Sequence, residues 1–328
     1  MKGGPLGIRK SKIRSVDEPA GAPRKKRRLK YIAILPSFIT LMNGACGFIA
    51  IVFASRSTEV RWSLFSMRYF NMTHFSLAGY MIILAMFADV LDGRVARLTR
   101  TTSSFGGQLD SLSDAISFGA APAFLMVKVV EHHLAHLSFE LLRFSMLIWR
   151  GIFFSAILYA MCAVVRLARF NVENEEDEAA HMNFVGLPSP AAAGVVVSLV
   201  IIHQWLLPRI AVSTSNNYRF FEIITLSVLP VITFFAGILM VSRIRYPHLP
   251  NQLLRGKKTL STLLLLFAVG LLIVWNIQLA LVVGFCGFAL FGVLRWIVTK
   301  CHAAISNAQK PAQEEHHAKA QRRGEEES

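Results

Sequence analysis

The sequence predicts an all-α, polytopic membrane protein, because long uncharged apolar runs alternate with short polar segments along the chain. Hydrophobic residues make up 54% of the 328 residues, more than the roughly 45–50% of a typical soluble domain. Helices satisfy their own backbone hydrogen bonds in lipid, so runs of this length indicate membrane-spanning helices. We expect a transmembrane helical bundle of about eight spans.

Each apolar run defines one expected span. In chain order the expected spans are Tyr31–Ser55, Thr73–Asp89, Gly106–Val130, Leu147–Val165, Gly186–Leu207, Phe220–Val241, Leu260–Trp275 and Gln278–Val298. The second run is short, and its helix is expected to continue through Asp92 to Arg97. Only Asn276 and Ile277 separate the last two spans, which predicts a tight helical hairpin.

Basic residues set the expected orientation of these helices. Eleven of the 35 Lys and Arg residues lie in residues 1–30. Most of the others lie in the loops and the tail that would be on the same side of the membrane as residues 1–30. Because cytoplasmic segments carry the excess of Lys and Arg, both termini and the loop after the second span are expected in the cytoplasm. The net charge of +15 lies beside membrane spans, which favours anionic lipid headgroups over nucleic acid as partners.

The distribution of apolar runs and charged residues divides the chain into four expected parts. These are a basic cytoplasmic tail (1–30), a six-span membrane domain (31–245), a two-span helical hairpin (246–300) and a polar cytoplasmic tail (301–328). The first part lacks a short apolar core before a cleavage site, so we expect no removable signal peptide. The four cysteines show no paired spacing, which argues against a disulfide framework or a zinc site. We expect an integral, multi-pass protein of a prokaryotic inner membrane.

Four aspartates at helical spacings are the most unusual feature of this apolar chain. Asp89 and Asp92 are three residues apart at the end of the second span, and Asp110 and Asp114 are four apart at the start of the third. Each pair projects from one face of its helix, so all four carboxylates can meet at the cytoplasmic face. A carboxylate at bilayer depth costs about 2.5–3.5 kcal/mol, and a hard cation such as Mg²⁺, Mn²⁺ or Ca²⁺ would compensate it.

The four carboxylates allow several interpretations. Two cations about 3.5–4 Å apart would bracket a phosphoryl group, with Arg97 as a donor to its oxygens. Ion or proton transport also uses intramembrane carboxylates, but it predicts groups spread through the membrane rather than at one face. Isolated aspartates near helix ends are often only solvated or capping groups, and a non-catalytic scaffold would need no such cluster. The spacing of the four aspartates, taken together, favours the two-metal interpretation.

The same segment resembles the signature of the CDP-alcohol phosphatidyltransferase family. It matches all eight defined positions, which are Asp89, Asp92, Gly93, Ala96, Arg97, Gly106, Asp110 and Asp114. The resemblance implies a core of six transmembrane helices, formed by spans one to six, with the site at the cytoplasmic side. It also implies two divalent cations, Mg²⁺ or Mn²⁺, a CDP-linked lipid as phosphatidyl donor, and a homodimer.

The resemblance further implies a role for each matched residue. Asp89, Asp92 and Asp110 would bind the metals, while Asp114 would be the general base and would also touch the second metal. The CDP pocket would be formed by Gly93, Ala96, Arg97 and Gly106.

Other segments resemble the phosphatidylserine synthase branch of this family, in which CDP-diacylglycerol and L-serine give phosphatidylserine and CMP. They are Arg166–Asn171, Phe184–Ala193, Ser242–Tyr246 and, in the first span, Thr40, Asn43 and Gly47. Ser37 departs from the asparagine that is common there. Arg166, Arg169 and Asn171 are candidates for binding the serine carboxylate or a phosphate, although the arginines would serve equally as membrane anchors.

The acceptor alcohol stays open between serine, glycerol 3-phosphate, an inositol phosphate and choline. A phosphorylated acceptor needs an additional basic pocket, which the acidic stretch at 173–178 does not obviously supply. The histidines His132, His133 and His136 only partly meet a helical metal-binding spacing and fall on the membrane side opposite the aspartates. We expect an interfacial loop there.

Overall fold

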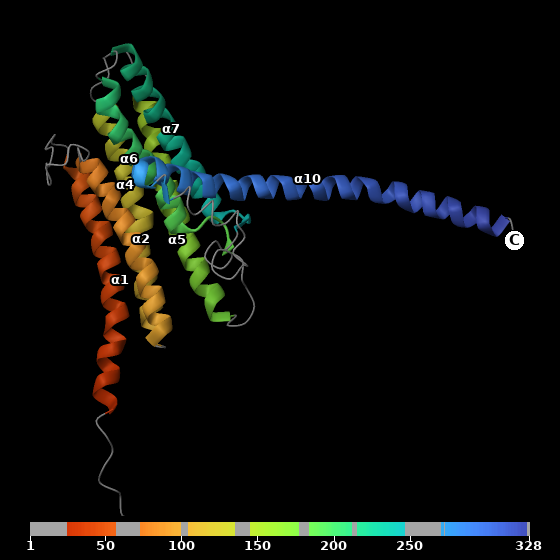
Figure 1. Ribbon diagram of the computed structural model, residues 1–328, viewed down its shortest axis with the longest axis horizontal. Coiled ribbons are helices and arrows are strands. Elements are labelled where there is room, and N and C mark those ends of the chain that lie inside the picture. Colours follow the sequence, from red (N-terminus) through yellow and green to blue (C-terminus); the bar gives the residue numbers. More distant parts are fainter. Residues whose placement is uncertain are drawn as a thin grey trace, which may run out of the picture.

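The protein, seen in a computed structural model, is an almost wholly helical bundle (Figure 1). The structure describes residues 25–56, 73–99, 104–134, 145–176, 184–211, 215–246, 270–271 and 273–326. Within them, seven helical stretches are long and apolar enough to cross a membrane. The all-α polytopic fold is therefore confirmed, and the protein is an integral, multi-pass membrane protein. Most of the seventh expected span, Leu260–Trp275, lies outside the described residues.

The helices follow the expected spans closely. They are α1 (Lys25–Ser55), α2 (His74–Thr99), α3 (Ser104–Asp114), the π-helical segment η1 (Ala115–Ala120), α4 (Ala121–Leu134), α5 (Ser145–Glu176), α6 (Ser189–Ala211), α7 (Ser215–Val241) and α10 (Ile277–Glu326). The segments α3, η1 and α4 follow one another without a break and cross the membrane as one unit. The expected continuation of the second span through Asp92 to Arg97 is confirmed by α2.

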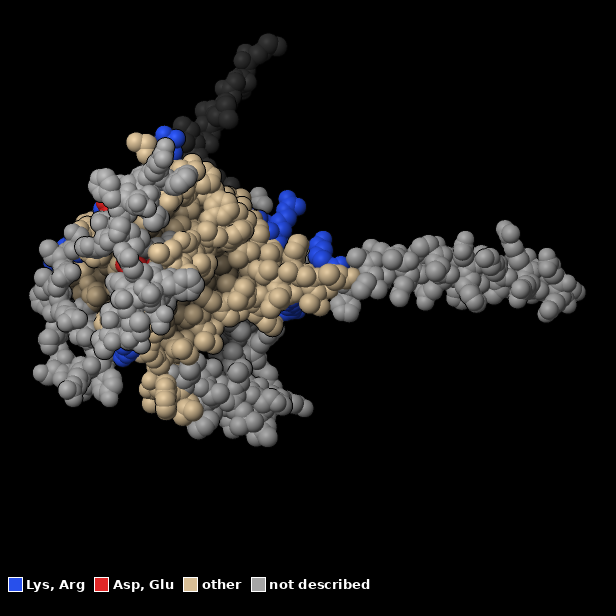
Figure 2. Space-filling view, turned by 90° about the horizontal axis from the view of Figure 1, so that it is seen from above, with Lys and Arg blue, Asp and Glu red and all other residues tan. Residues whose placement is uncertain are grey.

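Small residues let the helices pack closely while large apolar side chains face lipid. On α2, Ala78, Ile82 and Ala85 are fully buried along one face, whereas Phe87 is 63% exposed on another. Figure 2 shows a surface that is mostly uncharged, with Lys and Arg confined to its margins. Exposed apolar area on this scale suits a hydrocarbon environment, because packing and not hydrophobic exclusion holds helices together in lipid.

A two-residue strand pairing ties the start of α6 to the end of α7. The strands β1 (Phe184–Val185) and β2 (Arg245–Tyr246) pair antiparallel. Between β1 and α6, Gly186 adopts a φ of 89°, and a side chain there would collide with the carbonyl oxygen of Met240. Helix α6 begins only after this turn, at Ser189, three residues after the expected start of the span at Gly186, and the following Pro190 fits the first helical turn.

Helix α10 crosses the other helices and leaves the bundle, as Figure 1 shows. It packs on α6 where Gly194 accommodates the ring of Phe285, and on β2 where Gly292 accommodates the ring of Tyr246. Burial raises the pKa of Tyr246 to about 12, so its hydroxyl stays protonated and donates to the Ala289 carbonyl at 3.4 Å. The division of the chain at residues 245 and 300 stays a prediction.

The structure corrects the expectation for the histidine triplet. Its first two members end α4, and the third lies outside the described residues. His133 is buried, with Nδ1 3.0 Å from Oε1 of Glu222 on α7. The amide nitrogen of Gln204 lies 3.3 Å from Nε2 of His133 and 3.3 Å from Nδ1 of His203. Buried polar groups require partners, and here distant helices supply them.

Replacement of Glu222 by leucine is expected to destabilise the bundle by about 3 kcal/mol, because it leaves the buried imidazole of His133 without its acceptor. Melting temperatures of the purified protein in detergent measure the effect. The double variant with His133→Leu is expected to recover much of the loss, since it removes both polar groups. Ile223→Val, at the exposed neighbour, is the control. An unchanged melting temperature of Glu222→Leu would show that the contact contributes nothing.

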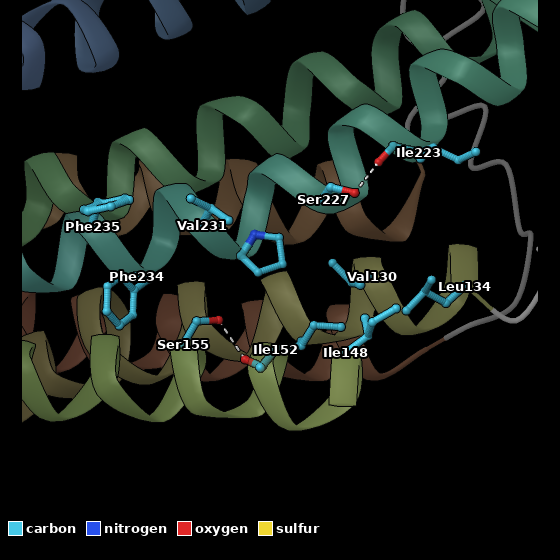
Figure 3. Close-up of a pocket in the computed structure, with 12 residues that line it drawn as sticks. Val130, Leu134, Ile148, Ile152, Ser155, Ile223, Ser227, Val231, Phe234 and Phe235 are labelled. Atoms are coloured by element: carbon cyan, nitrogen blue, oxygen red, sulfur yellow. Dashed lines mark hydrogen bonds between the residues drawn. The ribbon is translucent and has the colours of Figure 1, made fainter. Parts of the chain in front are cut away.

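An apolar cavity of about 490 Å³ opens between α4, α5 and α7 (Figure 3). The hydroxyls of Ser155 and Ser227 in its wall donate to carbonyls of their own helices, so they offer little to a polar ligand. None of the four aspartates lines the cavity, and Val130 in its wall is sixteen residues beyond Asp114. The cavity is therefore separate from the aspartates, and its apolar lining suits hydrocarbon.

Candidate active site

Three carboxylates from two helices meet at one end of the bundle. Asp89 and Asp92 extend from one face of α2, and Asp110 extends from α3. One carboxylate oxygen of each lies within 4.8 Å of the others. Asp92 is buried, and Asp89 and Asp110 are partly buried. The structure thus brings together three of the four aspartates that the sequence singled out.

The bonding of these three carboxylates fits a divalent cation. Asp92 accepts hydrogen bonds from the Thr40 hydroxyl and the Gly93 N–H. Its other oxygen, Oδ2, and Oδ1 of Asp110 are buried and accept no hydrogen bond from the described residues. Like charges this close repel, and unpaired carboxylate oxygens are costly to bury. Mg²⁺ or Mn²⁺ bound by these oxygens would relieve both costs, since hard cations prefer all-oxygen ligands.

Asp114 is placed beside this group of three rather than within it. It ends α3, is 8% exposed, and lies close enough for its charge to interact with Asp89 and Asp110. Its Oδ1 accepts a hydrogen bond of 2.8 Å from Nδ2 of Asn43 on α1. The fourth carboxylate is therefore oriented by an amide, which suits a group that exchanges a proton.

The π-helical segment η1 begins directly after Asp114 and is held from two sides. The Tyr159 hydroxyl on α5 donates to the carbonyl of Phe118 at 2.9 Å. The Ser117 hydroxyl donates to the backbone carbonyl of Asn43, also at 2.9 Å. Short π-helical segments are rare and occur often at functional sites. The sequence contains no recognisable signal for this segment, so its position was not predicted.

One face of α1 supports the aspartates. Thr40, Asn43, Gly44 and Gly47 follow at i, i+3, i+4 and i+7, so they share that face. A Cβ atom on Gly47 would lie 2.5 Å from Ser117 Oγ and 2.7 Å from its Cα. The glycines therefore let α1 approach closely enough for Asn43 to reach its carboxylate. The sequence does show these polar and small residues at helical spacing in an apolar span, which could have indicated a functional face. Their contacts with the aspartate region were not predicted.

The Gly47→Ala variant is expected to lose about tenfold or more of its activity, because the new methyl group meets the backbone of Ser117 and separates Asn43 from Asp114. The test is the rate of the catalysed reaction together with the melting temperature of the purified variant. Gly151→Ala is the matched control, since nothing lies within 4 Å of a Cβ atom there. Equal activity of both variants would contradict the role of this close contact.

Comparison with known proteins identifies the family. Residues 33–236 match the sequence profile described as CDP-alcohol phosphatidyltransferase. The chain belongs to the CDP-alcohol phosphatidyltransferase family. The match covers most of α1, all of α2 to α6 and most of α7, which hold the four aspartates of the site and the residues of α1 that support them.

Three relatives of this phosphatidyltransferase carry the name CDP-diacylglycerol–serine O-phosphatidyltransferase. The Helicobacter pylori protein is 32% identical over 242 residues, which are 74% of this chain and 88% of the relative. The Methanocaldococcus jannaschii protein is 30% identical over 225 residues, 69% of this chain and 79% of the relative. The Saccharomyces cerevisiae protein is 32% identical over 170 residues, 50% of this chain and 52% of the relative.

The structure places two of the three candidate acceptor-binding residues at the aspartate end of this phosphatidyltransferase. Nη1 of Arg166 donates to Ser189 Oγ at 2.8 Å, and its charge interacts with Asp114. Asn171 accepts a hydrogen bond of 2.9 Å from Ser111, the neighbour of Asp110. The third candidate, Arg169, lies exposed on α5.

The residues expected to form the CDP pocket lie between the two pairs of aspartates in the sequence. Gly93 and Gly106 are partly buried. A Cβ atom on the adjacent Gly107 would meet nothing within 4 Å, so open space adjoins the start of α3. Ala96 and Arg97 belong to α2, but their side chains lie outside the described residues. Their contribution to the pocket stays a prediction.

Proposed function

We propose that this phosphatidyltransferase transfers the phosphatidyl group of CDP-diacylglycerol to L-serine, giving phosphatidylserine and CMP. The observation that carries the proposal is the group formed by Asp89, Asp92 and Asp110, with Asp114 set beside it and held by an amide. The names of the relatives support serine as the acceptor. Arg166, which interacts with Asp114, supports an acceptor that carries a carboxylate.

The first three aspartates would hold two divalent cations, Mg²⁺ or Mn²⁺, and Asp114 would also reach the second. The buried oxygens of Asp92 and Asp110 that lack hydrogen bonds support this assignment. When bound, the cations supply positive charge that neutralises the pyrophosphate and makes CMP a better leaving group.

Asp114 would act as the general base. It accepts the proton of the serine hydroxyl as that oxygen forms a bond to the lipid-bearing phosphorus. The bond between this phosphorus and the bridging oxygen breaks, and CMP leaves with the electron pair. Arg166, Arg169 and Asn171 would bind the serine carboxylate or a phosphate oxygen. The CDP pocket would comprise Gly93, Ala96, Arg97 and Gly106.

We further propose how the enzyme sits in its membrane. Residues 31–245 would form the catalytic membrane domain, with the aspartates at the cytoplasmic face of a prokaryotic inner membrane and both termini in the cytoplasm. The excess of Lys and Arg in the N-terminal tail supports this orientation. The diacylglycerol chains would stay in the bilayer while serine arrives from the cytoplasm. A homodimer is proposed from the family resemblance, and cross-linking in native membranes tests it.

The decisive assay supplies the purified protein with CDP-diacylglycerol, Mn²⁺ or Mg²⁺, and one acceptor at a time, and measures CMP. Serine is expected to give at least about tenfold more CMP than glycerol 3-phosphate, inositol phosphate or choline. A chelator is expected to reduce release to background, with recovery on adding metal. If CMP release depended on another alcohol, that alcohol and not serine would be the acceptor. CMP release without a metal would contradict the two-cation site.

A further inference from the structure

Asn43 on α1 makes a hydrogen bond to the proposed base. It is fully buried, and its Nδ2 donates to Oδ1 of Asp114 at 2.8 Å. The amide nitrogen therefore faces Asp114, and the amide oxygen takes no part in this hydrogen bond. The backbone of Asn43 is fixed as well, because its carbonyl accepts the hydrogen bond from Ser117. The amide is thus held in one orientation.

The oxygen of this amide has no partner among the described residues. Oδ1 of Asn43 is buried and accepts no hydrogen bond from them. Buried side-chain acceptors are nearly always satisfied, so an exception at a reaction site points to a donor that arrives with the substrate. Since Oδ1 and Nδ2 are bonded to the same carbon, a donor to Oδ1 would lie next to the Asp114 carboxylate.

A second unsatisfied group lies near the same carboxylate. Nε of Arg166 is buried and donates no hydrogen bond to the described residues, while Nη1 is held by Ser189. The surroundings of Asp114 therefore offer a proton acceptor, a free amide oxygen and a free guanidinium N–H. A zwitterionic hydroxy amino acid carries the matching groups, which are a hydroxyl, an ammonium and a carboxylate.

We propose that Asn43 is a further active-site residue, whose N–H positions the Asp114 carboxylate and whose carbonyl oxygen accepts a hydrogen bond from the ammonium group of the acceptor. This inference rests on the proposed function, in which Asp114 takes the hydroxyl proton and leaves the ammonium as the donor for Oδ1. Glycerol 3-phosphate, inositol phosphate and choline carry no N–H group. Asn43 therefore contributes to the selection of serine over these alcohols.

Two substitutions at Asn43 separate its two functions. Asn43→Leu keeps the approximate shape and removes both hydrogen bonds, whereas Asn43→Asp keeps an acceptor oxygen and removes the N–H. The assay measures kcat and KM for serine from CMP release, together with inhibition by 3-hydroxypropionate, which has the hydroxyl and carboxylate of serine without the ammonium. Cys46→Ala, at a buried position one turn along α1, is the control for packing. The KM for CDP-diacylglycerol and the melting temperature verify that each variant is folded.

The Asn43→Leu enzyme is expected to raise the KM for serine roughly 10- to 100-fold while inhibition by 3-hydroxypropionate changes less than about threefold. Asn43→Asp is expected to lower kcat but to keep the preference for serine over this analogue. Cys46→Ala is expected to stay within about twofold of the wild type in every parameter.

A serine KM of Asn43→Leu within about twofold of the wild type would overturn the inference, even with a reduced kcat. Asn43→Asp retains an acceptor oxygen, so loss of its preference for serine over 3-hydroxypropionate would also contradict the inference. A wild-type enzyme that released CMP only with an acceptor lacking N–H would refute the proposed function and this inference together. Serine-dependent release by the wild type, with unaltered selectivity in Asn43→Leu, refutes only the role of Asn43.

Discussion

The Asp110→Asn enzyme is expected to release CMP roughly 10³-fold more slowly than the wild type. Asparagine has the size of aspartate but lacks its charge, so the change removes one anionic ligand without opening a cavity. Oδ1 of Asp110 is buried and accepts no hydrogen bond from the described residues, and one oxygen of Asp110 lies within 4.8 Å of those of Asp89 and Asp92. Removing its charge weakens the attraction for both cations and leaves the pyrophosphate less neutralised.

The measurement is the initial rate of serine-dependent CMP release as a function of Mn²⁺ concentration. The half-saturating Mn²⁺ concentration is expected to rise at least about tenfold in Asp110→Asn. Glu131→Gln is the matched control, because it removes a carboxylate of the same size near the far end of α4, where Glu131 pairs with Lys128. Its rate is expected to stay within about twofold of the wild type. Activity of Asp110→Asn above a tenth of the wild type would argue against a ligand role.

The Asp114→Asn enzyme is expected to bind the CDP-lipid almost as the wild type does, but to turn over about 10²- to 10⁴-fold more slowly. Asp114 lies outside the group of three carboxylates and is oriented by Asn43. An amide at position 114 keeps an oxygen for that hydrogen bond but cannot accept the serine proton. The substitution should therefore slow turnover without weakening the binding of the CDP-lipid.

Equilibrium binding of labelled CDP-diacylglycerol to the purified variant measures the affinity for the CDP-lipid, and single-turnover CMP release measures the rate of the reaction. Asp89→Asn provides the comparison, since loss of a residue from the group of three should weaken metal binding and slow turnover together. Near-wild-type turnover of Asp114→Asn would refute its assignment as base. Loss of CDP-lipid binding of the size seen in Asp89→Asn would instead assign it to the metals.

Features that depend on local composition could be predicted from the sequence. The expected span Phe220–Val241 became α7, Ser215–Val241, because a bilayer requires an apolar helix of nearly fixed length. The spacing of Asp89 and Asp92 correctly indicated that both carboxylates leave one face of α2. The turn at Gly186 could be anticipated, since glycine followed by Pro188 favours a turn before a helix.

Features that depend on contacts between distant segments could not be predicted. Asn43 and Asp114 are 71 residues apart, and His133 and Glu222 are 89 apart. The histidine prediction failed because a buried imidazole and a surface imidazole look alike in a sequence, and only the packing of α4 on α6 and α7 distinguishes them. The π-helical segment after Asp114 likewise depends on the hydroxyl of Tyr159, which comes from another helix.

Carboxylates of α2 and α3 are proposed to bind two divalent cations at the site of phosphatidyl transfer. Electron paramagnetic resonance of the purified protein, titrated with Mn²⁺ in the presence of CDP-diacylglycerol, tests this proposal. Two magnetically coupled Mn²⁺ ions per chain are expected, as for cations about 3.5–4 Å apart, and the coupled signal is expected to be lost in Asp110→Asn. Uncoupled Mn²⁺, or a coupled pair that persists in Asp110→Asn, would contradict it.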